Sequence, residues 1–440
     1  MSGPLKANEH LKDKRNALCP LKILALSFLA LCYWMGSSSI RVGAQTKNSC
    51  LDCHSKFDPP LQVNESEFLG SMHAQKGLSC TSCHGGDASS DDPARAMGSA
   101  AGFRGHIDRK QIPTLCAKCH SDTAYMRGFN PSLRTDQLSQ YQTSMHGKRF
   151  AKGDMKVAVC TDCHGVHDIQ PSRDARSKVY PLNVAKTCSN CHANPDHMKG
   201  YTIPTSQLAD YSASVHYDAL AVRGDFGAPT CSTCHGSHGA APPGVDSVAR
   251  VCSTCHVFQA QLFDSSPHKS VFASMGLPGC VTCHSNHRIQ HPTDAMIATS
   301  AGSVCMNCHA KGDSGFDAAG RIHTELTKLD ASIARSDDIL AKAERSGMEV
   351  GEAKLAESEA RDDLIKARVE IHTAEPSRVD PDIQAGLGVT AKAWQAGENA
   401  MAERSYRRKG LLVSLITIVF VLIGLFLVIR KLETESRGQP

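Results

Sequence analysis

Residues 160–192 read CTDCHGVHDIQPSRDARSKVYPLNVAKTCSNCH, and the tripeptide Ser144-Met145-His146 lies shortly before them. The stretch holds the pentapeptide Cys-x-x-Cys-His twice, with an extra histidine three residues after the first copy. The pentapeptide occurs nine times in the 440 residues and accounts for 18 of the 20 cysteines. The copies occupy residues 50–54, 80–84, 116–120, 160–164, 188–192, 231–235, 252–256, 280–284 and 305–309. Internal repetition of this kind is the first feature from which a fold is predicted.

The pentapeptide has the spacing of covalent haem attachment. Two thiols add across the vinyl groups of one porphyrin edge, and the adjacent histidine reaches the iron. Zinc ribbons pair two Cys-x-x-Cys units per ion, so nine units do not pair evenly, and neither zinc nor a redox dithiol requires the histidine. The sequence therefore predicts nine covalent haem c groups. The attachment residues are Cys50, Cys53, Cys80, Cys83, Cys116, Cys119, Cys160, Cys163, Cys188, Cys191, Cys231, Cys234, Cys252, Cys255, Cys280, Cys283, Cys305 and Cys308. The proximal ligands are His54, His84, His120, His164, His192, His235, His256, His284 and His309.

The motifs group into a larger unit of Ser-x-His, then Cys-x-x-Cys-His-x-x-His, then Cys-x-x-Cys-His. Three blocks follow it closely, and a first block is degenerate because Asp87 replaces the trailing histidine. Two spare histidines for two haems is the stoichiometry of bis-histidine ligation, and a trailing histidine is better placed to bind a neighbouring haem than its own. The predicted second ligands are His73, His106, His146, His167, His216, His238, His268 and His287.

The haem outside the blocks leaves its second ligand open. His197, His291, His323 and His372 are the candidates, and His323 is included among the predicted ligands. Each spare histidine has the alternative of being a solvated loop residue. Met72 and Met145 are alternative axial ligands by residue type.

Two apolar stretches predict export and a membrane anchor. Basic residues followed by an apolar run over 23–35 predict a signal peptide over residues 1–44, with an uncleaved anchor as the alternative. Without it the chain has 42 basic and 42 acidic residues. Residues 411–429 contain no charge and are long enough to cross a bilayer. The sequence therefore predicts a transmembrane helix over 410–430 and a cytoplasmic tail over 431–440.

Between the last motif and the predicted span, residues 317–409 have the composition of a helical neck. Ile322, Leu326, Leu329, Ile333 and Leu340 follow helical spacing. A second stripe extends from Ala353 to Ile371, so the two predict an antiparallel hairpin between Asp317 and Pro376. Asp380-Pro381 predicts the start of a third helix that continues into the membrane, with glycines at 386, 388, 397 and 410 as possible kinks.

The fold class predicted from these observations is mostly α and irregular: a haem array over residues 45–316, a C-terminal helical hairpin and one transmembrane helix. Aromatic residues are only 5 % of the chain, so side chains supply little of a conventional core. The porphyrins are expected to form the interior, and this region is not expected to fold without them. Haem propionates are expected to make the surface acidic.

Residues 50–309 resemble the membrane-anchored multihaem c-type cytochromes of the class III, low-potential type. The resemblance rests on the nine Cys-x-x-Cys-His units and the variants with a trailing histidine. It implies export before haem attachment, bis-histidine ligation, closely spaced haems and low potentials. The C-terminal anchor departs from the tetrahaem quinol-dehydrogenase cytochromes, whose anchor is N-terminal. The Cys-x-x-Cys-Lys motif of the multihaem nitrite reductases is absent from the sequence.

The sequence thus favours an electron carrier without its own chemistry, located on the periplasmic side of a bacterial inner membrane. Its partners would be other redox proteins, within a respiratory complex or outside one. A reductase or oxidase with one open haem iron and a haem-bearing structural subunit are the alternatives. Nucleic-acid binding is not indicated, because 48 basic residues nearly balance 44 acidic ones without a basic block.

Overall fold

The computed structural model describes residues 48–241 and 248–437, and the predicted signal peptide lies outside them. The described residues form helices and irregular loops without a β-strand, so the predicted fold class is confirmed. The chain divides into two compact units. The described part of the first, residues 48–63 and 79–105, contains α2 (Ser49–His54), α5 (Cys80–His84), α6 (Pro93–Ala96) and η1 (Ser99–Ala101).

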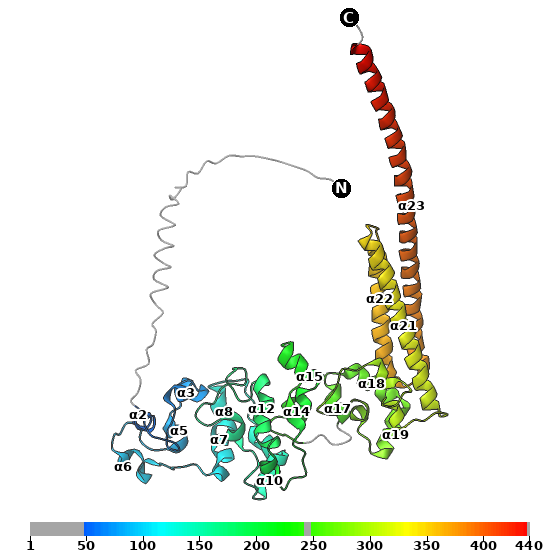
Figure 1. Ribbon diagram of the computed structural model, residues 1–440. Coiled ribbons are helices and arrows are strands. Elements are labelled where there is room, and N and C mark those ends of the chain that lie inside the picture. Colours follow the sequence, from blue (N-terminus) through cyan, green and yellow to red (C-terminus); the bar gives the residue numbers. More distant parts are fainter. Residues whose placement is uncertain (1–47, 242–247, 438–440) are drawn as a thin grey trace, which may run out of the picture. The chain divides into compact units, whose positions relative to one another are not determined.

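The second unit comprises residues 64–78 and everything after residue 105. Its motif region contains short helices joined by loops, drawn from blue through cyan and green to yellow-green in Figure 1. These are α3 (Glu65–Leu69), α4 (Met72–Gln75), η2 (Arg109–Gln111), α7 (Ile112–His120), α8 (Thr123–Arg127), α9 (Gln137–Thr143), α10 (Met145–Ala151), α11 (Cys160–His164), α12 (Pro181–His192), α13 (Pro195–Met198), α14 (Gln207–Ser212), α15 (Val215–Tyr217), η3 (Asp218–Val222), α16 (Cys231–His235), α17 (Val248–Ser253), α18 (Val257–Ser265), α19 (Pro267–Met275), α20 (Gly279–His284), η5 (Asp294–Ile297) and η6 (Cys305–Asn307).

Three long helices follow, and they include the predicted hairpin (Figure 1). They are α21 (Ser314–Arg345), α22 (Gly351–Glu370) and, after η7 (Ile371–Thr373), α23 (Pro376–Arg437). We call residues 314–409 the neck. Its first helix ends where the sequence predicts, because Gly347 adopts the left-handed φ of +77° that closes a helix.

The neck has a core made by its own side chains. Ile322, Leu326, Leu329 and Ile333 of α21 pack with residues of α22 and α23, and a second cluster is centred on Leu340. Leu326 and Leu329 have no exposed surface. The apolar residues at helical spacing therefore form the buried face of the neck helices, as the sequence predicts.

The start of the third helix differs from the prediction. The helix begins at Pro376 rather than at Asp380, and Pro381 lies inside it. Ala374 takes a left-handed φ of +59° just before, and Pro376 suits a first helical turn. The Asp380 carboxylate instead accepts a hydrogen bond from Arg321 of α21.

Two of the glycines expected to kink this helix have a packing role. A Cβ on Gly386 would lie 2.9 Å from Leu329 Cδ1, and one on Gly397 would lie 2.7 Å from Ile339 Cγ2. Both glycines therefore allow α23 to approach α21 closely, which a larger residue would prevent.

Beyond the neck, α23 continues without interruption as one apolar helix that could span a membrane. The large apolar side chains of residues 411–429 are each 47–69 % exposed. The exposure distinguishes this segment from a buried core helix, in which such side chains are covered.

Candidate haem sites

The motifs that open a block share one local structure. Cys80–His84, Cys160–His164, Cys231–His235 and Gly279–His284 are single-turn helices ending at the motif histidine. The next residue has a positive φ in all four cases, namely Gly85, Gly165, Gly236 and Ser285. The chain therefore turns directly after the motif histidine, and glycine accommodates that conformation best.

The motifs that close a block lie in different contexts. His120 and His192 end the longer helices α7 and α12. His256 follows α17, and His309 follows η6. In α7 and α12, which contain their whole motifs, helix spacing sets the two cysteines and the histidine within about one turn of each other.

The serine of the Ser-x-His tripeptide begins the short helix that carries the histidine. The hydroxyls of Ser71, Ser144 and Ser214 accept backbone N–H groups three residues ahead, at 3.2, 2.9 and 3.2 Å. All three serines are buried. Serine is a preferred N-cap, so the repeat uses it to fix the first turn and the histidine within it.

A backbone hydrogen bond links each of these tripeptides to a later block. The N–H of Met72 donates to Ile169 (2.8 Å), that of Met145 to Ala240 (3.0 Å) and that of Val215 to Ile289 (2.9 Å). Each acceptor lies two residues after a trailing histidine of the next block. Each block is therefore joined to the next by the same backbone hydrogen bond at equivalent positions of the repeat.

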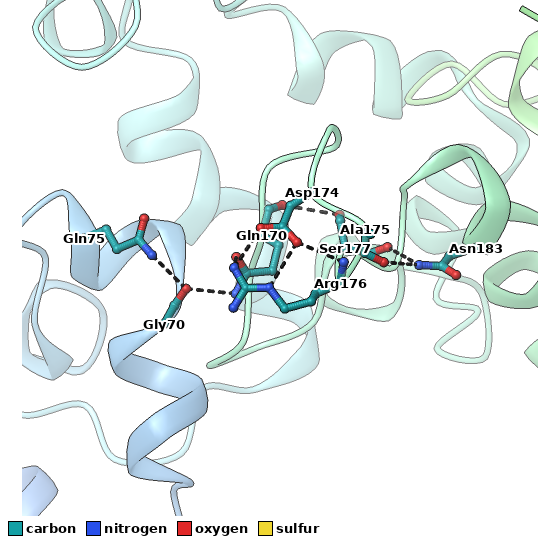
Figure 2. A network of polar contacts seen from close by, with 8 residues as sticks. All are labelled: Gly70, Gln75, Gln170, Asp174, Ala175, Arg176, Ser177 and Asn183. Carbon is teal, nitrogen blue, oxygen red and sulfur yellow. Dashed lines mark hydrogen bonds and ion pairs between the residues drawn. The ribbon is translucent and has the colours of Figure 1, made fainter. Parts of the chain in front are cut away.

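Side chains reinforce the first of these junctions (Figure 2). Gln75 and Gln170 both donate to the Gly70 carbonyl, at 3.1 and 3.0 Å, and Arg176 donates to Gln170 Oε1 at 3.2 Å. Arg176 is also paired with Asp174. This network holds the segment around His73 against the loop that follows residue 167.

Among the residues that the structure describes, seven pairs of histidines lie with their ring centroids 5.9–6.3 Å apart. Each pair contains one motif histidine and one spare histidine. The pairs are His73–His120, His146–His192, His164–His238, His216–His256, His235–His287, His268–His309 and His284–His372.

The first six pairs obey two rules. Each Ser-x-His histidine lies opposite the second motif of its own block, as His146 lies opposite His192. The trailing histidines His238 and His287 lie opposite the first motif of the preceding block, at His164 and His235. The seventh pair joins the last block to the neck.

Burial favours the neutral form of these imidazoles. It lowers the pKa of His73, His146 and His216, and that of His164 to about 4. A buried imidazole loses hydration that its charged form needs. Neutral imidazole is the form that binds a metal ion.

Several ring nitrogens are already engaged on one side. Nδ1 of His84 contacts the Gly105 carbonyl (3.0 Å), that of His235 the Ala241 carbonyl (3.2 Å) and that of His309 the Asp313 carboxylate (3.1 Å). Such a bond fixes the ring and leaves Nε2 available to a metal ion.

The motif cysteines are free of disulfide bonds. Thiols of consecutive motifs lie against each other: a hydrogen bond with Cys116 lowers the pKa of Cys160, and one with Cys188 lowers that of Cys231 to about 7. A hydrogen bond with Cys252 lowers the pKa of Cys280 to about 7. No group of three or more metal-binding side chains converges within the described residues.

Other predicted ligands have different surroundings. His106 and His291 are exposed, and His167, His197 and His323 are half-buried. Within the described residues, His106, His197, His291 and His323 form no histidine pair of the kind above. His54 packs edge-on against Phe57 at 5.3 Å.

Comparisons with known proteins agree with this chemistry. Residues 72–193 match the model of the cytochrome c3 family. The chain is 24 % identical over 209 residues to the C-type polyheme cytochrome OmcC of Geobacter sulfurreducens, an alignment that covers 42 % of this chain and 26 % of that relative. The chain thus spans about a quarter of that relative's length. No solved structure matches. The two matches support a multihaem c-type cytochrome.

Proposed function

We propose that this multihaem c-type cytochrome is an electron carrier with nine covalent haems, most of them held between two histidines. The observation that carries the proposal is the set of paired imidazoles. A metal–imidazole bond is about 2 Å long and the ring centroid lies about 1 Å beyond the nitrogen, so two imidazoles on opposite sides of one ion have centroids about 6 Å apart. The seven pairs have this separation.

The donor set fits haem c. Each pair includes the histidine of a Cys-x-x-Cys-His motif, whose two cysteines form no disulfide bond. Haem bound in this way supplies one-electron transfer. An iron with two histidine ligands has no free position for a substrate, which supports a carrier over an enzyme.

The order of the motifs in the second unit supports electron transfer between haems whose motifs are consecutive in the sequence. The motif helices α7, α11, α12 and α16 contact one another in succession, and α17 contacts α20. First cysteines meet at Cys116–Cys160, Cys188–Cys231 and Cys252–Cys280. Second cysteines interact electrostatically in the intervening steps, between Cys163 and Cys191, Cys234 and Cys255, and Cys283 and Cys308. We infer that neighbouring motifs in the sequence hold neighbouring haems from residue 116 to residue 309.

The membrane helix and the polyhaem relative point to a membrane-associated cytochrome. Within the proposal, residues 1–44 are a cleaved signal and the motif region lies in the periplasm of a bacterial inner membrane. From Pro376 to residue 411, α23 extends over 35 residues, or about 50 Å along its axis. That length favours a redox protein outside the bilayer, rather than a quinol within it, as the partner.

One observation favours a second candidate function. Among the described residues, the motif histidine His54 has an aromatic side chain, Phe57, as its ring neighbour and no second imidazole. A haem at residues 50–54 with one open position would be the site of a multihaem reductase or oxidase.

Electron paramagnetic resonance of the oxidised protein tests both candidates. A carrier gives low-spin ferric signals only, and His146→Ala converts the haem at residues 188–192 to the high-spin form. An unchanged spin state in His146→Ala would contradict the ligand assignment. A high-spin signal in the unmodified protein that responds to added cyanide would favour the reductase.

A further inference from the structure

We propose that His372, in the neck, is the second axial ligand of the haem attached at Cys280 and Cys283. The inference rests on the proposed function, because it requires that the motif at residues 280–284 carries haem. It adds a ligand from outside the repeated blocks and gives the neck a part in the haem array.

The geometry at this position matches that of the block pairs. The rings of His284 and His372 have centroids 6.1 Å apart and planes 23° apart. For the trailing histidines His238 and His287 the corresponding values are 6.0 Å and 13°, and 5.9 Å and 16°. The rings of His372 and His284 therefore have nearly the same separation as those of His238 and His164, and both pairs are stacked.

The ring of His372 is oriented for this role. Its Nδ1 lies 2.8 Å from the carbonyl of Val369, in the preceding turn. With Nδ1–H donated to that carbonyl, Nε2 carries the lone pair that a metal ion requires. The residue lies in η7, between α22 and α23, where the chain turns at the base of the neck.

The repeat explains why a residue from the neck is needed. The first haem of each of the two middle blocks receives its second histidine from the block that follows. The motif at residues 280–284 opens the last block, and no block follows it. The neck follows the last block in the sequence, and its His372 lies opposite His284, where a trailing histidine of a following block would lie.

A change in the last tripeptide is consistent with this substitution. Met72, Met145 and Val215 donate their N–H groups to the following block. The corresponding residue of the last block is Pro267, which has no N–H group. The last block therefore has no N–H group at the position from which the other blocks donate a hydrogen bond to the block that follows them.

Other contacts hold the base of the neck in position. Arg368, one turn before His372, forms a two-pronged ion pair with Asp294 of η5, at 2.9 and 2.8 Å. Ile297 of η5 and Ile371 of η7 pack on the same apolar cluster of the neck. The α18 helix, which directly precedes the last block, also contacts η7. The ion pair and the apolar contacts thus fix the position of the half-buried His372.

The test compares three alanine variants of the full-length, haem-loaded protein. His372→Ala removes the proposed ligand, His323→Ala removes a neck histidine that has no imidazole partner among the described residues, and His146→Ala removes a ligand from within a block. We expect His372→Ala and His146→Ala each to convert one haem in nine to the high-spin ferric form, reversed by added imidazole, and His323→Ala to leave the spin states as they are in the unmodified protein.

The outcomes separate the two proposals. A low-spin His372→Ala protein beside a high-spin His146→Ala protein overturns the role of His372 and leaves the proposed function intact. Unchanged spin states in both overturn bis-histidine ligation itself. If His372→Ala does not accumulate, His372→Met serves instead, because methionine can ligate haem iron. A single haem with a histidine–methionine spectrum supports the inference, and a spectrum without methionine ligation contradicts it.

Discussion

The motif region and the neck are stabilised in different ways. Of the 29 buried apolar residues in the part of the chain that the structure describes, 12 precede residue 314 and 17 lie in residues 314–409, although the first segment is more than twice as long. Both apolar clusters of the described residues have their buried members in the neck. The neck therefore has a core made of its own side chains, whereas the motif region buries few apolar side chains for its length.

This difference predicts the largest effect in the molecule. Full-length protein made without haem attachment should lose residues 48–313 to limited proteolysis, because that region buries too little apolar surface of its own. Residues 314–437 should survive as a helical fragment in detergent. Mass spectrometry of the digest and far-ultraviolet circular dichroism are the measurements, and a motif region as resistant as the neck would contradict the comparison.

The core of the neck should be sensitive to the loss of one side chain. Leu329→Ala empties a position with no exposed surface and should cost about 2–5 kcal/mol of unfolding free energy. Leu355→Ala, where the side chain is 74 % exposed, is the control and should change stability by less than about 0.5 kcal/mol. Urea titration followed by circular dichroism compares them. Equal costs would show that α21 is not packed as described.

The close approach of α23 to α21 gives a second matched pair. Gly397→Ala places a methyl group against Ile339 and should cost about 1–3 kcal/mol. Gly388→Ala meets nothing within 4 Å and should stabilise the helix by up to about 1 kcal/mol, since alanine is the better helix former. The sign of the effect on the thermal midpoint distinguishes the two positions, and two effects of the same sign would contradict the packing.

The smallest expected effect concerns the buried Glu357 of the neck. Burial raises its pKa, and its carboxylate accepts a hydrogen bond from Ser336. Because the folded protein disfavours the charged form, the neck should lose stability as pH rises from the ordinary glutamate pKa through the raised one. Glu357→Gln should remove this loss and raise the thermal midpoint at pH 7 by up to about 4 °C, with no gain at low pH. A lower midpoint at pH 7 would show that the charge is stabilising.

Much of this architecture can be predicted from the sequence because its signals are local. A pentapeptide of fixed spacing identifies the attachment sites, and a serine two residues before a histidine identifies a capped helix. Apolar spacing identifies α21 and α22, as Leu326 and Leu329 illustrate.

The sequence does not predict which motif histidine lies opposite each spare histidine in the folded protein. His238 lies three residues after the motif histidine His235, yet its neighbour in space is His164 of an earlier block. His372 and His323 look alike in the sequence, and only the fold of the neck brings one of them to His284. Gly397 likewise looks like a kink until the position of Ile339 is known.

Near-infrared magnetic circular dichroism of the oxidised full-length protein tests the central claim most directly, because its bands distinguish bis-histidine ligation of ferric haem from other ligand sets. The seven histidine pairs predict bis-histidine intensity for at least seven haems per chain. Intensity for clearly fewer than seven, with the remainder high-spin or ligated by methionine, would contradict the account.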